Sequence, residues 1–289
     1  MTKQPKVRKP HPVLHGIGLV LSVILLVAVL VGTYVLSTMA TIIDSFIGAP
    51  SGHYSDAEIA DTKVKAEALA ADVEAEGTVL VQNNDNTLPL AADKKKINVF
   101  GWASTSPCYG GTGSGALNDA YPVTDLLTGL HDAGIETNDE LSKFYTDYCA
   151  TRPSVGMAQQ DWTLPEPNVS LYTDEMMANA KEYSDTAMVV ITRVGGEGAD
   201  LPTDMAAVVD GSWVRRVADY RGSQRGAGYY NGSYDDSLNE GNDWDAGDHF
   251  LQLSNREEEL IDLVTSNFDN VIVVYNGANA FEMGWVKDY

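Results

Sequence analysis

The longest uncharged stretch of the chain runs from Gly16 to Ile43 and holds 28 residues without an acid, a base or a histidine. A helix needs about 20 apolar residues to cross a bilayer, whereas the apolar region of a cleaved secretory signal is usually about 7–15 residues long. The stretch therefore predicts an uncleaved membrane anchor over residues 16–43. The alternatives are a cleaved signal, with a poor small-residue site at Thr38-Met39-Ala40, and a buried core helix.

A cluster of basic residues precedes this stretch, namely Lys3, Lys6, Arg8 and Lys9. Basic flanks of membrane helices stay on the cytoplasmic side. We therefore expect a single-pass protein of the cell membrane, with residues 1–15 as a cytoplasmic basic tail and the rest outside the cell. Residues 44–55 are expected to form a short tether, and residues 56–289 one external domain.

The external part is strongly acidic. Beyond residue 50 the chain has 15 basic and 40 acidic residues, a net charge of −25. Phosphate binding needs clustered lysine and arginine, so this charge excludes a nucleic-acid partner held on a broad basic face. The chain is 44% hydrophobic, which excludes a disordered chain. About 240 residues are enough for one large α/β domain with its own core.

Helical patterns recur along this domain. Ser55 and Glu58 have the spacing of a capping box, which predicts a helix start. Further helices are expected over residues 123–133, 139–150 and 253–268, the first of them ending at Gly134, a favourable C-cap residue. The first helix has several apolar residues that are candidates for its inner face, and these are Ile59, Val64, Ala68, Leu69 and Val73.

Strand-like segments alternate with these helices. The short run at residues 97–100 is one candidate, and the runs at 187–192 and 271–275 are continuously apolar, as in strands buried on both faces. This alternation predicts an α/β fold with a mainly parallel sheet flanked by helices. Residues 203–249 are crowded with Gly, Asn, Asp and Tyr and are expected to be irregular.

A glycine-rich segment extends from Tyr109 to Gly115. Part of it, from Gly111 through Gly113 to Ala116, fits the loose dinucleotide-binding pattern. Eight residues separate it from the strand at 97–100, however, and a phosphate loop follows its strand directly. No nucleotide cofactor is therefore expected. Two interpretations remain, a structural turn and a loop in which Gly111 and Gly113 line a substrate cleft.

A second glycine-rich segment, from Arg193 to Pro202, follows directly on the predicted strand at 187–192. Ligands of open α/β sheets bind outside the carboxyl ends of the strands. Glu197, set among glycines, has a reachable carboxylate of the kind that serves as a general acid. The alternative is a solvated loop glutamate, and Asp200 has the same two interpretations.

Other residue types give weaker signals. No histidine or cysteine spacing indicates a metal site, and Cys108 and Cys149 are compatible with one disulfide or with two free thiols. Aromatic residues in the loops can stack on sugars or pack the loops together, and Trp213 is the main candidate for a sugar contact. The aromatic residues expected to be exposed are Trp102, Tyr109, Trp213, Tyr220, Tyr229, Tyr230, Tyr234 and Trp244.

Several of these segments together resemble one known family. Residues 76–84, with Thr87-Leu88-Pro89-Leu90, resemble the opening of the α/β-sandwich domain of family 3 glycoside hydrolases, the β-glucosidase group. The resemblance continues through residues 97–101, 110–115 and 189–200. It then covers 251–254 and 271–285, and so extends over residues 67–289.

The resemblance implies an exo-acting, retaining β-glycosidase that needs no cofactor. In that family an aspartate nucleophile lies on a separate barrel domain, and a glutamate from a sandwich loop is the general acid/base. Glu197 resembles that glutamate. The implied substrate is a β-glucoside or an oligosaccharide, and the two carboxyl groups of a retaining pair lie about 5–5.5 Å apart.

Two features depart from the family pattern. The sandwich follows the anchor without a preceding barrel, and the sequence given stops at Tyr289, so a permuted and truncated arrangement is expected. The nucleophile motif Ser-Asp-Trp is missing. Asn242-Asp243-Trp244 and Ser184-Asp185-Thr186 imitate it, but neither lies at the end of an apolar strand. The chain alone is thus expected to be nearly inactive, and a non-catalytic, membrane-tethered sugar-binding or interaction module is the alternative.

Overall fold

The computed structural model describes residues 12–47, 54–111, 123–149, 161–195, 201–213, 233–235, 237 and 243–289. Two of the predicted site residues, Gly113 and Glu197, lie outside these ranges. The chain divides into two compact units, Met1–Val81 and Gln82–Tyr289, and each is considered by itself. The unit boundary falls at Val81, whereas the sequence predicted a domain that starts at residue 56.

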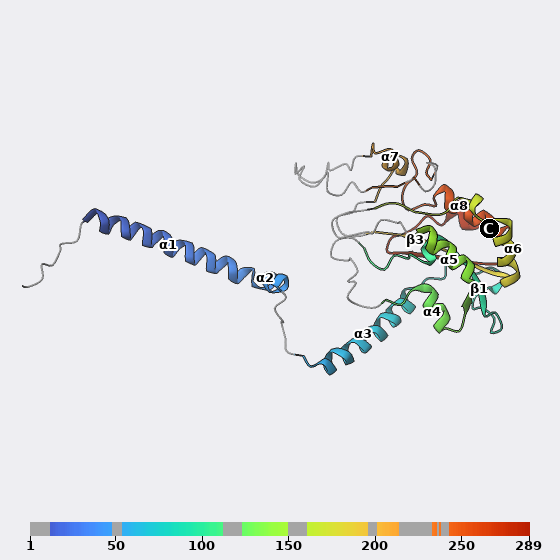
Figure 1. Cartoon of the computed structure of the whole chain (residues 1–289), viewed down its shortest axis with the longest axis horizontal. Helices are drawn as coiled ribbons and strands as arrows, with labels where there is room; N and C mark the ends of the chain where they lie inside the picture. Colours follow the sequence, from blue (N-terminus) through green and yellow to red (C-terminus); the bar gives the residue numbers. More distant parts are fainter. Residues whose placement is uncertain are drawn as a thin grey trace, which may run out of the picture. The chain divides into compact units, whose positions relative to one another are not determined.

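The first unit begins with α1 (Pro12–Thr38), a helix long and apolar enough to span a bilayer (Figure 1). The Thr38 hydroxyl donates to the carbonyl of Tyr34, and the helix is interrupted at Met39. A second helix, α2 (Ala40–Ile47), follows it. The predicted anchor at 16–43 thus covers parts of two helices, and the first four residues of the predicted tether are helical.

The third helix, α3 (Asp56–Gly77), begins at the predicted capping box. The Ser55 hydroxyl accepts from the Glu58 amide, and the Glu58 carboxylate accepts from the Ser55 amide at 2.8 Å. The predicted inner face is wrong, because no residue of α3 is buried. The alanines and charged residues between the apolar positions leave no continuous apolar stripe for another element of this unit to cover.

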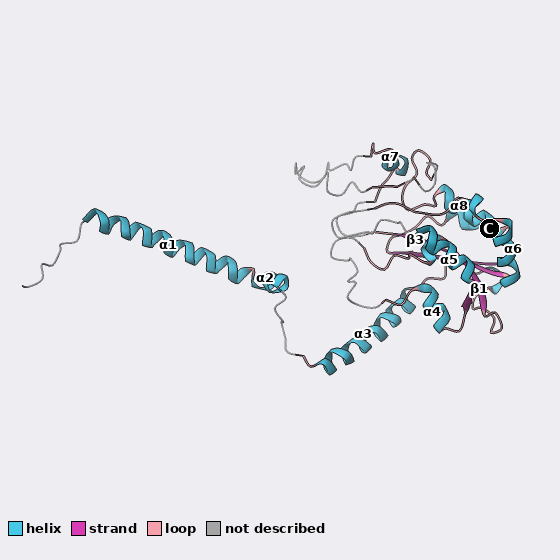
Figure 2. Ribbon diagram, in the orientation of Figure 1, coloured by secondary structure: helices cyan, strands magenta, loops and turns pink. Residues whose placement is uncertain are grey.

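The second unit contains a four-stranded parallel sheet in the order β2-β1-β3-β4, with helices along it (Figure 2). The fold class predicted from the sequence is therefore correct for this unit. The strands are β1 (Lys96–Phe100), β2 (Glu136–Thr137), β3 (Thr186–Arg193) and β4 (Asn270–Gly277).

The two long strands differ in burial. All eight residues of β3 are buried, as the apolar run predicted, because β1 and β4 pair with its two sides. In β4 only Ile272 is buried, and most of the other residues are half-buried. The sequence predicted a fully buried strand there. The difference arises because β4 pairs with β3 on one side, and no described strand pairs with the other.

The described part of the second unit contains five α-helices. Helices α5 (Asp139–Tyr148) and α6 (Asp174–Tyr183) pack against β1, and α8 (Asn255–Thr265) packs against β3. Helix α4 (Leu126–Asp132) precedes Gly134, whose φ of +76° confirms the predicted helix end. The sequence analysis did not predict α6 or the short α7 (Met205–Val209).

Arg193, the last residue of β3, forms a buried ion pair with Glu257 near the start of α8. The guanidinium and the carboxylate are bonded at two points, 2.7 and 2.6 Å, and the two side chains are 0% and 2% exposed. The remaining Arg193 donors reach backbone carbonyls, which belong to Thr192, Phe250 and Gln252. All five N–H groups of the arginine are thus used.

The Glu257 carboxylate also accepts from the Ser254 amide at 2.9 Å, in a second capping box, and α8 lies within the helix predicted over residues 253–268. The Arg193 guanidinium lies between the rings of Phe250 and Phe281, at 5.5 and 4.9 Å from their centroids. The end of β3, the start of α8 and the segment after β4 are therefore joined through this one arginine.

We predict that Arg193→Met lowers the free energy of unfolding by about 3–5 kcal/mol, because it leaves the Glu257 carboxylate buried without its partner. Urea unfolding of the purified chain measures this. Adding Glu257→Leu should recover part of the loss. Lys143→Met is the control, since Lys143 and Asp147 pair at the surface, with 74% and 65% of their side chains exposed, and should cost less than about 1 kcal/mol. A loss below 1 kcal/mol for Arg193→Met would contradict the prediction.

Candidate active site

Three strands end at the same edge of the sheet. β1, β3 and β4 end at Phe100, Arg193 and Gly277, and because they are parallel their carboxyl ends lie side by side. The two glycine-rich segments predicted to be functional follow β1 and β3. This edge is therefore the candidate active site, in the position where open α/β sheets bind ligands.

The chain turns sharply where it leaves β1. Gly101 has φ +93°, and a Cβ atom there would lie 2.4 Å from the carbonyl oxygen of Val190 in β3. Only glycine fits this close approach. The turn leads into the 3-10 segment η2 (Trp102–Ser104) and then to Cys108, which immediately precedes the glycine-rich loop.

A buried carboxyl group holds the start of η2. Glu166 is 1% exposed, and its Oε2 accepts from the Trp102 amide at 2.9 Å. Its Oε1 accepts from the Tyr172 hydroxyl at 2.9 Å, and Tyr172 and Tyr145 share a further hydrogen bond of 2.5 Å. Burial, and to a smaller extent the charge of Glu257, raise the pKa of Glu166 from its ordinary 4.5 to about 8, although the hydrogen bonds from Trp102 and Tyr172 act to lower it.

One side chain of β4 contacts both the end of β3 and the segment that follows β1. Asn276 Oδ1 accepts from the Cys108 amide at 2.8 Å, and the Thr192 hydroxyl lies 2.8 Å from the same oxygen. Asn276 thus joins the loop that follows β1 to the end of β3. Its own side chain is half-buried.

Gly195 begins the loop that contains Glu197. A Cβ atom at Gly195 would lie 2.4 Å from Nδ2 of Asn279, in the segment after β4. Gly195 therefore lies against the segment after β4. Two contacts hold that segment in place: the Phe281 ring packs on Arg193, and the Glu282 amide donates to the Leu251 carbonyl. Larger residues at Gly195 have no room unless Asn279 moves.

The predicted sugar-contact residues differ in burial and in position. Gly111 is half-buried at the end of the described part of its loop, and Gly113 lies beyond it. Trp213 is partly buried and packs against the core, and its amide donates to the Ala207 carbonyl at 2.8 Å. Its role as a sugar contact stays a prediction.

The expectation of exposed aromatic residues is wrong at two positions. Trp102 and Trp244 are 1% and 7% exposed and belong to the core, because the segments that contain them pack against the sheet and its helices. Tyr109 is exposed as predicted, and Tyr234 is half-buried, with its hydroxyl donating to Asp243 at 2.6 Å. Tyr220, Tyr229 and Tyr230 lie outside the described residues.

Neither imitation of the nucleophile motif is open to a substrate at the carboxyl edge. Asp243 is buried, accepts from Tyr234, and has Arg256 Nε 3.7 Å from its Oδ1. Asp185 precedes β3 at the opposite, amino end of the sheet, where it pairs with Lys94. The role of nucleophile is therefore assigned to neither residue.

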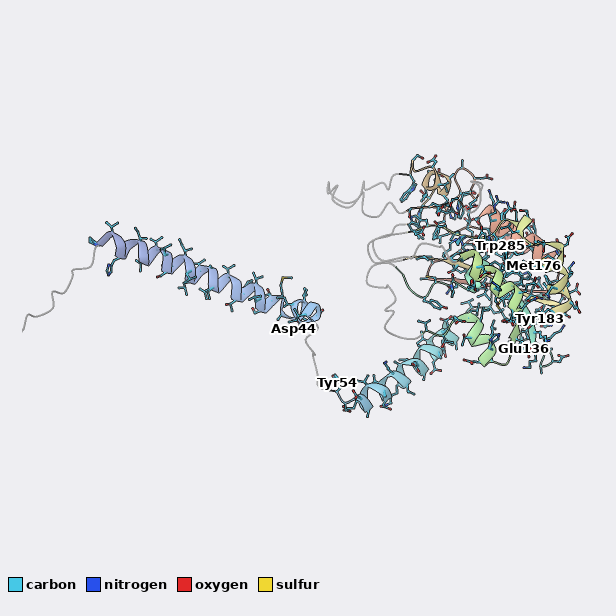
Figure 3. The ribbon with its side chains drawn as sticks, viewed as in Figure 1. Asp44, Tyr54, Glu136, Met176, Tyr183 and Trp285 are labelled. Atoms are coloured by element: carbon cyan, nitrogen blue, oxygen red, sulfur yellow. The ribbon has the colours of Figure 1, made fainter. Side chains whose placement is uncertain are left out.

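The amino end of the sheet has a surface cavity of about 730 Å³, lined among others by His131, Asn138 and Tyr183. Figure 3 shows Glu136 and Tyr183 there, and Lys96 lies near both, 3.8 Å from the Glu136 carboxylate and 5.2 Å from the Tyr183 ring centre. The cavity lies at the end of the sheet opposite to the carboxyl ends of β1 and β3, which the two predicted loops follow. The carboxyl ends of the strands, and not this cavity, therefore define the candidate site.

Among the described residues no group of three or more His, Cys, Asp or Glu side chains is arranged to hold a metal ion. Cys108 and Cys149 form no disulfide in the described part of the chain, which favours two thiols over the single disulfide. His249 and Glu282, 3.1 Å apart, join the segment before α8 to the segment after β4.

Sequence reasoning missed three residues that build this edge, namely Glu166, Asn276 and Arg193 as an ion-pair residue. For Arg193 a signal exists, since a charge at the end of a fully apolar strand needs a buried partner. For Glu166 and Asn276 no local pattern distinguishes them, because their partners are 64 and 168 positions away in the chain.

Comparison with known protein families identifies the class to which this α/β fold belongs. The sequence model of the family described as "Glycosyl hydrolase family 3 C-terminal domain" matches residues 78–289, and the chain belongs to this family. The resemblance stated from the motifs is thereby confirmed.

Named relatives agree with this assignment. The chain is 30% identical over 222 residues to "Beta-glucosidase A" of Butyrivibrio fibrisolvens, an alignment that covers 76% of this chain and 23% of the relative. It is 28% identical over 224 residues to "Beta-glucosidase" of Ruminococcus albus, covering 76% of this chain and 18% of the relative. The chain thus spans about a fifth of the length of these relatives.

Solved structures support the same fold. A β-glucosidase of Paenibacillus barengoltzii is 28% identical with a TM-score of 0.52, covering 76% of this chain and 19% of the other. β-Glucosidase 3B of Thermotoga neapolitana, solved with α-D-glucose, has a TM-score of 0.54 and covers 85% of this chain and 28% of the other. At 24% identity, the second likeness concerns the fold alone.

We predict that the pKa of Glu166 makes the second unit less stable as pH rises. The folded protein keeps the Glu166 proton up to about pH 8, whereas the unfolded chain releases it near pH 4.5. The free energy of unfolding therefore falls across this window, by up to about 1.4 kcal/mol per pH unit. The Tyr145 and Tyr172 pKa values are raised well above 10 by burial, so neither hydroxyl titrates there.

Urea unfolding at pH 5, 6, 7 and 8 measures this dependence. Glu166→Gln keeps an acceptor for the Trp102 amide and should flatten the dependence, whereas Glu175→Gln, at an exposed position of α6, should keep the wild-type slope. Equal slopes for the wild type and Glu166→Gln would show that Glu166 ionises normally.

Proposed function

We propose that this chain is the sandwich-domain part of a membrane-anchored, retaining exo-β-glycosidase of the β-glucosidase type. The observation that carries the proposal is the family match over residues 78–289, combined with the position of Glu197. Glu197 lies four residues after Arg193, in the loop that follows the most deeply buried strand at the carboxyl edge. The proposed substrate is a β-glucoside or an oligosaccharide.

In this proposal Glu197 is the general acid/base. It donates its proton to the glycosidic oxygen while an aspartate oxygen bonds to the anomeric carbon and the glycosidic bond breaks. The Glu197 carboxylate then takes a proton from water, whose oxygen attacks the anomeric carbon and releases the aspartate. That aspartate belongs to a barrel domain, which is the partner that the proposal requires beyond residues 1–289.

The second candidate function is a non-catalytic, membrane-tethered module that binds sugars or another partner. One observation favours it. Asp243, which imitates the nucleophile motif, is buried against Tyr234 and Arg256. In that case the fold and the strand-end loops serve binding without turnover.

We predict the role of Glu197 in a hybrid enzyme in which residues 78–289 replace the matching segment of the Butyrivibrio fibrisolvens β-glucosidase A. Glu197→Gln should reduce hydrolysis of an aryl β-glucoside by about 10²–10⁴-fold. With a dinitrophenyl leaving group, which needs no protonation, added azide should restore turnover and yield a glycosyl azide, because azide attacks the glycosyl-enzyme without a base. Asp200→Asn in the same loop is the control and should stay near wild type.

Loss of activity without azide rescue would contradict the acid/base role, and full activity of Glu197→Gln would favour the binding module. The 289-residue chain by itself should show no turnover above background, with or without Asp243→Ala. Turnover that Asp243→Ala abolishes would show that the nucleophile lies in this chain after all.

We further propose that α1 anchors the chain in the cell membrane with residues 1–11 in the cytoplasm, on the support of its length, its composition and the basic residues before it. A protein with a tag before Met1 should keep the tag and stay in the membrane during alkaline extraction. External protease should digest residues 54–289 and leave the tag intact. Deletion of residues 12–47 should release the protein. Loss of the tag from the mature protein would indicate a cleaved signal.

A further inference from the structure

The two loops predicted to be functional are connected through Asn276. Its Oδ1 atom accepts from the amide of Cys108, the residue that immediately precedes Tyr109 and the glycine-rich loop. The hydroxyl of Thr192 lies 2.8 Å from the same oxygen, in the strand that leads to Glu197. This carboxamide therefore lies between the end of β3 and the segment that leads from β1 to the glycine-rich loop.

The orientation of the carboxamide follows from these contacts. A backbone N–H is only a donor, so the atom that faces the Cys108 amide has to be the oxygen. The NH₂ group of Asn276 is therefore directed away from the Cys108 amide, and its orientation is fixed by the bonds that its oxygen makes.

The NH₂ group itself has no hydrogen-bond partner within the described part of the chain. Nδ2 makes no hydrogen bond to any described residue, and it is not among the buried side-chain atoms that lack a partner. The Asn276 side chain as a whole is half-buried. Two N–H donors at the carboxyl edge thus have no hydrogen-bond partner among the described residues, and the oxygen of the same carboxamide, which is already bonded, holds them in place.

We propose that Asn276 is a substrate-binding residue whose Nδ2 group donates a hydrogen bond to a hydroxyl oxygen of the bound glycoside. The inference rests on the proposed function, since it takes the carboxyl edge as the sugar site. A donor that is already oriented loses little conformational freedom when the ligand arrives. A sugar hydroxyl is a suitable partner because its oxygen accepts while its proton remains available to another group.

The competing account is that Asn276 only holds the two loops together. Asn276→Asp separates the two accounts, because the aspartate keeps an acceptor for the Cys108 amide and loses both N–H donors. Asn279→Asp is the matched control. It introduces the same charge at the same edge of the sheet, in the segment that touches Gly195, and it leaves Asn276 unchanged.

The experiment is a titration of the full 289-residue chain with methyl β-D-glucoside, in micelles of a detergent without a sugar headgroup. Affinity is measured by calorimetry, and the Asn276 side-chain NH₂ signals are followed by ¹H–¹⁵N NMR. We expect these signals to shift with the same saturation curve as the calorimetric binding. Asn276→Asp should weaken binding about tenfold, and Asn279→Asp by less than about twofold.

Several outcomes would overturn the inference. Binding without a shift of the Asn276 NH₂ signals, or equal losses in Asn276→Asp and Asn279→Asp, would leave Asn276 as an anchor between loops. The NMR shift tests the wild-type chain directly, so the result does not depend on the folding of a variant. If the wild-type chain binds no methyl β-D-glucoside, the inference fails for this chain, while azide rescue in the hybrid enzyme separately decides the role of Glu197.

Discussion

The fully bonded Arg193–Glu257 pair is the interaction on which the carboxyl edge of the sheet depends. An arginine at the end of a buried strand is costly unless every donor has a partner, and here each of its five N–H groups has one. The partners come from β3, from α8 and from the segment before α8. One charged side chain thus fixes the place from which the loop of Glu197 departs.

The two edges of the sheet are held by different physical means. At the carboxyl edge the contacts are directional, and they are buried at Arg193 and Glu166 and half-buried at Asn276. At the amino edge Lys94 and Lys96 pair with carboxylates that are largely exposed, and such pairs contribute little to stability. Buried hydrogen bonds of this kind define one arrangement of the backbone, which an edge that binds and positions a ligand requires.

The sequence was most informative where the signal is local. The apolar run of β3, the capping box at Ser55 and the turn at Gly134 each depend on neighbouring residues, and the structure has all of them as predicted. Contacts between distant residues could not be predicted. Glu166 looks like any loop glutamate until Trp102 and Tyr172 are brought to it by the fold.

The half-buried strand β4 has a consequence for how the protein behaves in solution. Its eight residues contain no charged side chain and no proline, which are two of the features by which sheets discourage pairing at an open edge. Among the described residues no strand pairs with the side of β4 away from β3, so its backbone groups there can pair with another extended segment. The domain has far more acids than bases, and the resulting repulsion opposes such pairing between molecules. Salt weakens that repulsion and would favour self-association.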